Sequence, residues 1–257
     1  MLPIAAVVVA VSMIAAALRI DSAVAQLVSG AGVVAVYVGY VRWIERRRLD
    51  ELGAAGAAPE LARGLVLGAL LFAATVAVLC VVGVCEIGGG GGALGVLRVL
   101  AAAAGASMIE ETMFRAVVFR LVERGLGTWI ALALSAAMFG LVHMFNAGAT
   151  VVSTLAIALE AGVLLAAAFI LTRRLWLAFG LHAAWNFTEG GVFGAAISGG
   201  HTQGLFTTRF HGNSLITGGA FGPEASIVAI AICLVAGIAL LVVAHRRGHF
   251  VPPYWRR

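Results

Sequence analysis

Two adjacent glutamates and an arginine interrupt an apolar run at residues 108–120, "MIEETMFRAVVFR". Glu111 and Arg115 are four residues apart, so on a helix they share a face and can form an ion pair. Glu110 is rotated by about 100° from Glu111, so the same pair does not neutralise it. Two interpretations follow. Either both glutamates share Arg115 and stabilise the fold, or Arg115 holds Glu111 and leaves Glu110 free for chemistry.

Two further stretches carry polar or aromatic side chains one helical turn apart. In "FGLVHMFN", Phe139 and His143 have the i,i+4 spacing, so the phenyl ring can wall the pocket that holds the imidazole. In "GLHAAWNF", His182 and Asn186 have the same spacing and project to one side. Taken singly, such residues are also common as hydrogen-bonded contacts between membrane helices.

Together these side chains make up a hydrolytic set of one carboxylate, two imidazoles and one amide. A water held by Glu110 and His143 could be deprotonated and attack an amide carbonyl. His182 and Asn186 could donate hydrogen bonds to the oxyanion, an effect worth about 3–4 kcal/mol per donor. This chemistry requires the four side chains to meet in one cavity.

The composition predicts that the elements carrying these residues are membrane helices. Of the 257 residues, 62% are hydrophobic and only 11% are charged, whereas soluble domains carry about 25% charged residues. A membrane-spanning helix needs about 20 apolar residues. We expect an all-α polytopic membrane protein, a single integral membrane domain at 1–257, with about eight transmembrane helices. Their predicted ranges are 2–18, 23–43, 64–86, 94–124, 128–146, 149–172, 175–194 and 225–245.

The arginines indicate an orientation. The chain has 17 arginines and no lysine, and most arginines form short blocks between apolar runs. By the positive-inside rule this placement predicts an integral protein of the cytoplasmic (plasma) membrane with both termini cytoplasmic. The blocks are not gathered on one face as a nucleic-acid groove would require, so we expect no nucleic-acid partner. Counting the helical rise of 1.5 Å per residue from the arginines places the cavity loosely on the cytoplasmic side.

Two features of the chain allow other interpretations. The segment 2–18, followed by "SAVAQ", could be a cleaved signal peptide, but it lacks a basic start, so we favour a retained helix. Cys80, Cys85 and Cys233 lie in apolar runs, are odd in number and lack metal-type spacing. They are therefore predicted to be small hydrophobic side chains rather than a disulfide framework.

The three motifs resemble those of the CPBP intramembrane proteases, the CAAX-protease and bacteriocin-processing group also called the Abi family. The resemblance covers about residues 105–190, which would form the core protease region. It implies an endopeptidase related to the CAAX prenyl proteases, in which Glu110 activates water with His143 as its partner. It further implies that His182 and Asn186 form the oxyanion site, with Glu111 and Arg115 in support.

The resemblance leaves the metal question open, because the family is sometimes described as metallopeptidase. If a metal such as zinc takes part, its ligands would be Glu110, His143 and His182. No His-Glu-x-x-His sequence is present, and Asn186 suits an oxyanion donor better than a zinc ligand, so a metal-free mechanism is preferred.

Two other function classes remain as alternatives. Intramembrane carboxylates and histidines also occur in proton-coupled transporters, and an inactive relative could act as a membrane scaffold.

Glu160, in the middle of a predicted helix, is expected to be a supporting partner of Arg115 or of the backbone rather than a catalytic group. The expected partners are the lipid bilayer and a peptide or membrane-protein substrate. The family suggests prenylated CAAX proteins, peptide precursors or bacteriocin leaders.

Overall fold

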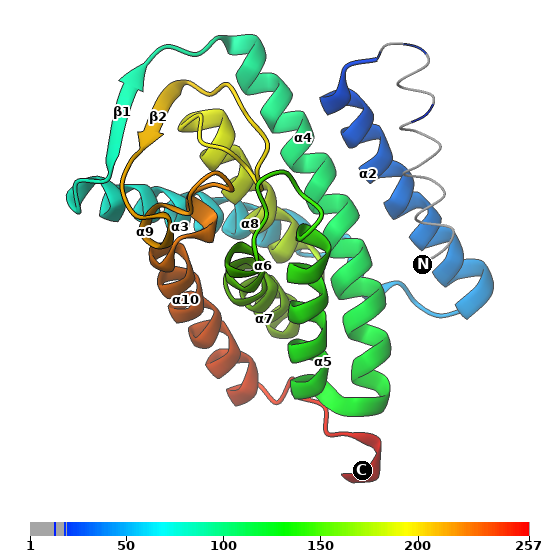
Figure 1. The fold of residues 1–257 in the computed structure, drawn as a ribbon. Helices are drawn as coiled ribbons and strands as arrows, with labels where there is room; N and C mark the ends of the chain where they lie inside the picture. Colours follow the sequence, from blue (N-terminus) through cyan, green and yellow to red (C-terminus); the bar gives the residue numbers. More distant parts are fainter. Residues whose placement is uncertain (1–12, 14–17, 19, 257) are drawn as a thin grey trace.

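The computed structural model describes residues 13, 18 and 20–256 of the chain. Helices account for most of these residues and form one bundle (Figure 1), so the predicted all-α class is confirmed. The predicted helix at 2–18 lies almost entirely outside the described residues. The long helical segments, in which η denotes π-helical stretches, are α2 (Ser22–Gly39) with η1 (Tyr40–Glu45), α3 (Ala57–Val81), α4 (Ala93–Glu111) with η3 (Thr112–Phe119), α5 (Arg120–His143), α6 (Val151–Ile157) with η4 (Ala158–Gly162), α7 (Val163–Thr172), α8 (Trp176–Asn186) with η5 (Phe187–Val192), and α10 (Ile227–Arg246).

Five helical stretches of the described part are long and apolar enough to cross a membrane, and they are Ser22–Glu45, Ala57–Val81, Ala93–His143, Val151–Thr172 and Ile227–Arg246. The third has 51 residues, far more than one crossing needs. It turns back at Gly127, where φ is 80° and ψ is 170°, so α4 and α5 run in opposite directions (Figure 1). This stretch therefore contains the predicted helix at 94–124 and most of the one predicted at 128–146, which ends at His143. The protein is a polytopic membrane protein, as the sequence predicted.

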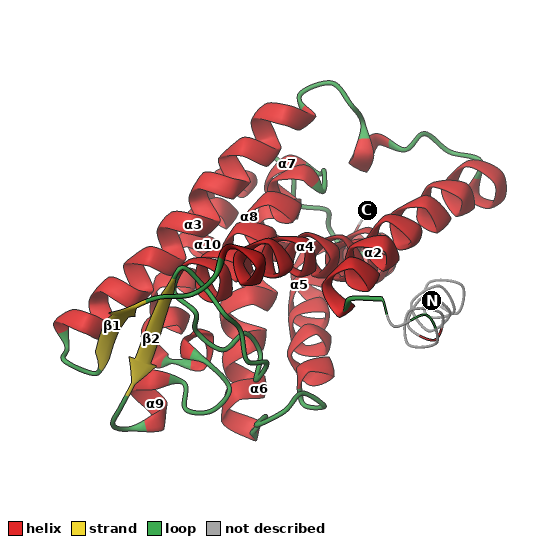
Figure 2. Ribbon diagram, turned by 90° about the horizontal axis from the view of Figure 1, so that it is seen from above, coloured by secondary structure: helices red, strands yellow, loops and turns green. Residues whose placement is uncertain are grey.

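The core of the bundle forms around α6 and α7. In the span Val151–Thr172, 72% of the most apolar window is buried, against 22% in the span Ile227–Arg246. α4 lies between α2 and α8 (Figure 2). The helix that carries His182 and Asn186 is therefore enclosed by protein and not left at the lipid surface.

Glycines set how closely α8 approaches α3. A Cβ on Gly68 would lie 2.2 Å from the carbonyl oxygen of Leu181, and one on Gly180 would lie 2.3 Å from that of Leu61. Small residues allow such close backbone approach between membrane helices. The contact fixes the height and rotation of α8 one residue before His182.

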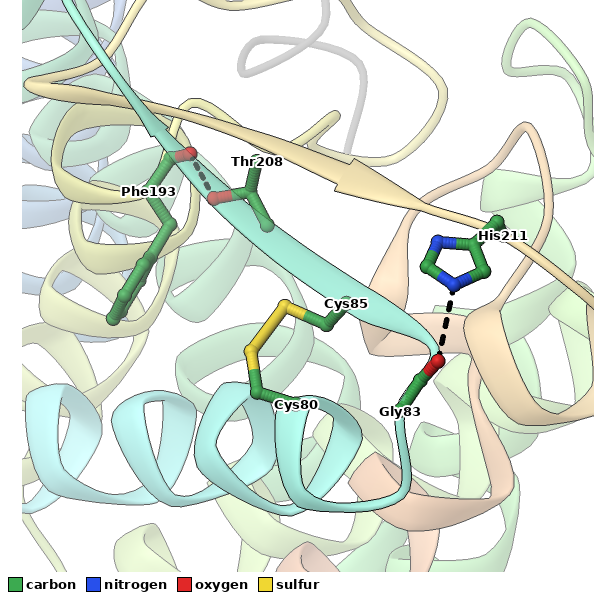
Figure 3. Close-up of a disulfide and its surroundings, with 6 residues drawn as sticks. All are labelled: Cys80, Gly83, Cys85, Phe193, Thr208 and His211. Atoms are coloured by element: carbon green, nitrogen blue, oxygen red, sulfur yellow. Dashed lines mark hydrogen bonds between the residues drawn. A yellow bond between two sulfur atoms is a disulfide. The ribbon is translucent and has the colours of Figure 1, made fainter.

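A two-stranded antiparallel sheet, which the sequence did not predict, covers one end of the bundle. Strand β1 (Cys85–Gly89) follows α3 and pairs with β2 (Phe206–Phe210), and Cys85 lies opposite Phe210. A disulfide joins Cys80 in the last turn of α3 to Cys85 (Figure 3), so the prediction that these cysteines are only small hydrophobic side chains was wrong. The α3–β1 turn brings the two cysteines together within five residues. Cys233 is a buried free cysteine.

The sheet is also tied to the helices below it. The hydroxyl of Thr208 donates to the carbonyl of Phe193 at 2.6 Å, and a ring nitrogen of His211 lies 3.0 Å from the carbonyl oxygen of Gly83 (Figure 3). Phe193 packs in turn against Phe72 of α3. The disulfide, the sheet and the end of η5 thus form one connected cap.

The arginine blocks lie together at the opposite end. Arg120 pairs with Glu45 at 2.7 Å, which joins the end of η1 to the start of α5. Arg174 pairs with Glu60 at 3.1 Å and so joins the α7–α8 turn to the first turns of α3. The shared position of the arginine blocks therefore agrees with the sequence prediction, whereas the compartment that this end faces stays a prediction. Below, these segments are called the arginine-rich end, comprising residues 42–63, 120–129, 170–176 and 245–256.

Candidate functional site

A fully buried ion pair forms where α4 continues into η3. Glu111 Oε2 is 3.1 Å from Arg115 Nε, and neither side chain is exposed. The guanidinium lies over the ring of Phe139, 4.7 Å from its centroid, and Nη2 donates to the carbonyl of Ala161 at 3.4 Å. Arg115 therefore ties α4 to α5 and η4, and it holds the carboxylate of Glu111 in one position.

Glu110 lies outside this pair and faces a cavity. Its Oε2 is 3.8 Å from Nε2 of His143 and 4.0 Å from Nε2 of His182. These separations are too long for direct hydrogen bonds, but one water molecule placed beside Glu110 could contact the carboxylate and an imidazole together. The arrangement corresponds to the interpretation in which Arg115 holds Glu111 and leaves Glu110 free.

The partners of the two imidazoles assign their protons. Nδ1 of His143 is 2.7 Å from the carbonyl oxygen of Phe139, and because a carbonyl only accepts, Nδ1 carries a proton and donates it. In the neutral ring Nε2 is then an acceptor that faces Glu110. Nδ1 of His182 is 3.0 Å from Glu111 Oε1, so it donates to that carboxylate. Nε2 of His182 also donates only when the ring is an imidazolium, a form that the carboxylate of Glu111 stabilises.

One cavity of about 530 Å³ brings the predicted residues together, and its lining includes Glu110, Phe139, His143, Glu160, His182 and Asn186. Glu111 and Arg115 lie behind this lining. The cavity also reaches Asn146 in the α5–α6 turn and the loop residues Ser198 and Thr202. These segments lie at the end opposite the arginines, so the expectation that the cavity lies toward the arginine-rich side was wrong. Helical rise gives the height of a residue along its own helix, but the loop residues that close the cavity at the other end do not follow that rise.

Glu160 does not pair with Arg115, contrary to the sequence expectation. It lies in η4 with 2% of its surface exposed and lines the cavity. The side chains that act electrostatically on it are those of Glu224 and Cys233. Arg115 instead reaches the backbone carbonyl of the next residue, Ala161, while Glu160 faces Cys233 of α10.

Glu224 is a cavity residue that the sequence analysis missed. Its Oε1 accepts hydrogen bonds from the backbone nitrogen of Ser198 at 2.7 Å and from the Ser198 hydroxyl at 2.8 Å. Burial raises the pKa of the Glu224 carboxyl. Glu224 lies in the short 3₁₀ turn η6 (Pro223–Ala225), which precedes α10. Only the folded outer loop shows that this turn reaches the cavity.

The three possible zinc ligands do not form a metal site as arranged. Among the described residues, no group of three or more His, Cys, Asp or Glu side chains could hold a metal ion. Ligand atoms in a tetrahedral zinc site are about 3.3 Å from one another, whereas Glu110 Oε2 is 3.8 and 4.0 Å from the two Nε2 atoms. As arranged, these atoms are farther apart than the ligands of a bound zinc ion, and the preferred metal-free mechanism stays a prediction.

Comparison with protein families gives one match. Residues 91–188 match the family described as type II CAAX prenyl endopeptidase Rce1-like. The matched segment runs from the start of α4 to η5 and contains Glu110, His143, His182 and Asn186. Comparison with curated proteins and with solved structures gives no match. The predicted resemblance to the CPBP intramembrane proteases is thereby confirmed at the level of the family.

Proposed function

We propose that the protein is an intramembrane endopeptidase that hydrolyses peptide bonds with a water activated by Glu110, which the match of residues 91–188 to the type II CAAX prenyl endopeptidase Rce1-like family supports. The observation that carries this proposal is the position of the Glu110 carboxylate, within 4.0 Å of Nε2 of both His143 and His182, at the wall of one cavity. The substrate is a peptide or membrane protein whose scissile bond enters the bundle.

Glu110 and His143 activate the water in the proposed first step. His143 donates from Nδ1 to the Phe139 carbonyl, so its neutral Nε2 accepts a hydrogen bond from the water and orients it. Glu110 takes the other proton as the water oxygen attacks the amide carbon. A carbon–oxygen bond forms, the carbonyl π bond breaks, and the negative charge moves to the carbonyl oxygen.

His182 and Asn186 stabilise that oxyanion. They are one helical turn apart on α8 and both line the cavity. Glu111, held in place by Arg115, positions His182 through Nδ1, and its carboxylate favours the imidazolium form, so Nε2 can donate to the oxyanion. Glu110 then passes its proton to the departing amine as the carbon–nitrogen bond breaks, and water restores the starting state.

The test is peptide cleavage by the purified protein reconstituted in liposomes, with a library of quenched fluorescent peptides. Glu110→Gln and His143→Ala should each lower kcat by about 10²–10⁴-fold, the usual contribution of general acid–base catalysis. Glu86→Gln is the matched control, because this exposed carboxylate lies in β1, away from the cavity lining. Full cleavage by both variants would remove the assigned roles.

Two further arms of the same assay test the competing explanations. A zinc chelator should leave the rate unchanged, whereas a loss of activity that added zinc restores would assign Glu110 and both histidines as ligands instead. Proton-driven solute flux into the liposomes without any cleavage would replace the peptidase by a transporter. Absence of both activities, together with specific binding of a membrane protein, would indicate a scaffold.

A further inference from the structure

The C-terminal segment after α10 is docked against the corner where α4 turns into α5 (Figure 1). The backbone nitrogen of Thr128 donates to the carbonyl of Val251 at 3.0 Å, and the nitrogen of Val251 donates to the Thr128 hydroxyl at 2.9 Å. A Cβ on Gly127 would lie 2.8–3.0 Å from backbone atoms of this segment. The close approach therefore requires glycine, and the segment has a defined position on the corner.

Aromatic side chains complete this contact and also remain exposed around it. Phe250 packs between Trp129, at a ring-centroid distance of 4.8 Å, and His245, at 5.3 Å. Trp129 and Trp255 nevertheless keep 62% and 55% of their surface exposed. Tryptophan in this position is typical of the membrane–water interface, where the ring sits at the level of the lipid headgroups.

Four exposed arginines lie on the segments that meet at this corner. Arg124 lies on the first turns of α5, Arg246 and Arg247 end α10, and Arg256 lies in the last described turn. Among the described residues none of the four has an ion-pair partner, whereas Arg120 and Arg173 of the same end are paired with glutamates. Their positive charge is therefore available to a ligand. We call this surface the basic–aromatic corner, and it comprises Arg124, Trp129, Arg246, Arg247, Trp255 and Arg256.

We propose that the basic–aromatic corner binds the phosphate-bearing headgroups of anionic phospholipids. α10 is a candidate membrane span that ends at Arg246, so the arginines that follow lie at the height of the bilayer surface. Guanidinium groups bind phosphate oxygens through paired hydrogen bonds, and the neighbouring tryptophans sit among the glycerol and ester groups. Each basic residue near an anionic surface strengthens binding by about fivefold.

Docking of the segment distinguishes this corner from a general excess of positive charge. Arg42, Arg46 and Arg63 are also exposed, lie at the arginine-rich end and have no ion-pair partner among the described residues. Trp43, beside Arg42, is exposed as well, but among the described residues the docked C-terminal segment hydrogen-bonds to Thr128 and not to this part of the chain. They provide a control set with the same number of charges at the same end of the bundle.

The experiment measures binding of pyrene-labelled phosphatidylglycerol and pyrene-labelled phosphatidylcholine to the detergent-solubilised full chain. The triple variant R246Q/R247Q/R256Q should bind phosphatidylglycerol about 100-fold more weakly than the parent, from three contributions of about fivefold each. The control triple R42Q/R46Q/R63Q should lose no more than about fivefold. Phosphatidylcholine binding should stay the same in all three proteins.

A second pair of variants keeps every charge and loosens the docked segment. Thr128→Val removes the hydroxyl that accepts from the Val251 nitrogen and donates to Glu123, and Phe250→Ala removes the contact with Trp129. Each should weaken phosphatidylglycerol binding by at least about fivefold, the contribution of one arginine, while the protein elutes as the parent does in size-exclusion chromatography. Equal losses in the two triples, or unchanged binding in both loosened variants, would overturn the proposal. The outcome does not depend on the proposed peptidase, because no lining residue of the cavity is changed.

Discussion

The fully buried Arg115–Glu111 pair contributes both to the stability of the folded protein and to the proposed reaction. Removing one member of a buried pair leaves an uncompensated charge and costs about 3–5 kcal/mol. We therefore expect Arg115→Met to lower the thermal unfolding midpoint strongly. The double variant Glu111→Gln/Arg115→Met leaves no unpaired charge there, so it should regain part of the lost stability.

Activity should not follow the stability of these variants. His182 loses its carboxylate partner in the double variant, because Nδ1 now faces an amide. We expect kcat to remain at least about tenfold below that of the parent, with little change in KM, which is the pattern for a group that acts mainly in the transition state. Unfolding curves and cleavage kinetics on the same samples check both statements. A double variant with parental kcat would show that Glu111 does not position His182.

Sequence spacing reveals pairs on one helix but not contacts across the fold. The i,i+4 rule predicted the Glu111–Arg115 pair, and the structure has it at 3.1 Å. Glu224 lies far along the chain from every motif, and its approach to Ser198 depends on how the outer loop folds. No local pattern reports such a contact. The assigned roles of Glu110, His143, His182 and Asn186 stay predictions until they are tested by mutation.

At the level of secondary structure, the sequence predicts where the helices lie but not which parts of them are π-helical. Residues 112–119, 158–162 and 187–192 are π-helical, and the first and last begin directly after Glu111 and Asn186. The spacing of hydrophobic residues in the sequence does not distinguish a π-helical turn from an α-helical one. π-Helical turns are frequent at functional sites. The β1–β2 sheet was missed because its strands are short and rich in glycine and threonine.

The loop between α2 and α3 is held by a buried carboxylate. Glu51 accepts hydrogen bonds from Arg47 and from the Tyr37 hydroxyl, and this joins the loop to α2. Burial of Glu51 favours its neutral form, but the hydrogen bonds from Arg47 and Tyr37 outweigh burial, so the pKa of Glu51 is lowered. The ionised carboxylate therefore stabilises the loop in the folded protein.

This pKa shift gives a pH dependence with a defined sign. The folded-state pKa lies below the unfolded value of about 4.3, so the stabilisation is complete above that pH and is lost as the pH falls through the lowered pKa. Glu51→Gln should destabilise the protein by about 3 kcal/mol at neutral pH, as expected for breaking a buried charged contact. The difference from the parent should shrink as the pH falls.

Thermal unfolding of both proteins between about pH 7 and about pH 3 checks this expectation, because that range includes the unfolded glutamate pKa. Asp50→Asn is the matched control, since the neighbouring Asp50 side chain is 77% exposed and pairs only with the exposed Arg48. A stability difference for Glu51→Gln that stays constant with pH would contradict the assignment.

For the whole molecule, the two ends of the bundle differ in chemistry. Arginines and exposed tryptophans mark one end, and the disulfide-linked cap marks the other. Disulfides form in oxidising compartments and are rare in the cytosol, while arginine-rich loops favour the cytoplasmic side. The two observations are independent, and both favour the same orientation. The sequence alone supplied only the arginine argument, because the disulfide became apparent from the turn that brings Cys80 to Cys85.

This orientation has a consequence for access to the cavity. The cavity lining includes His201 and other residues of the loop at the capped end, so in this orientation that part of the lining faces away from the cytoplasm. In intact cells, a membrane-impermeant maleimide should therefore label His201→Cys, whereas Arg247→Cys at the arginine-rich end should react only after the membrane is permeabilised. Both sites are exposed in the fold, and the parent serves as the control for the native cysteines. Labelling of Arg247→Cys alone in intact cells would reverse the orientation and place the capped end on the cytoplasmic side.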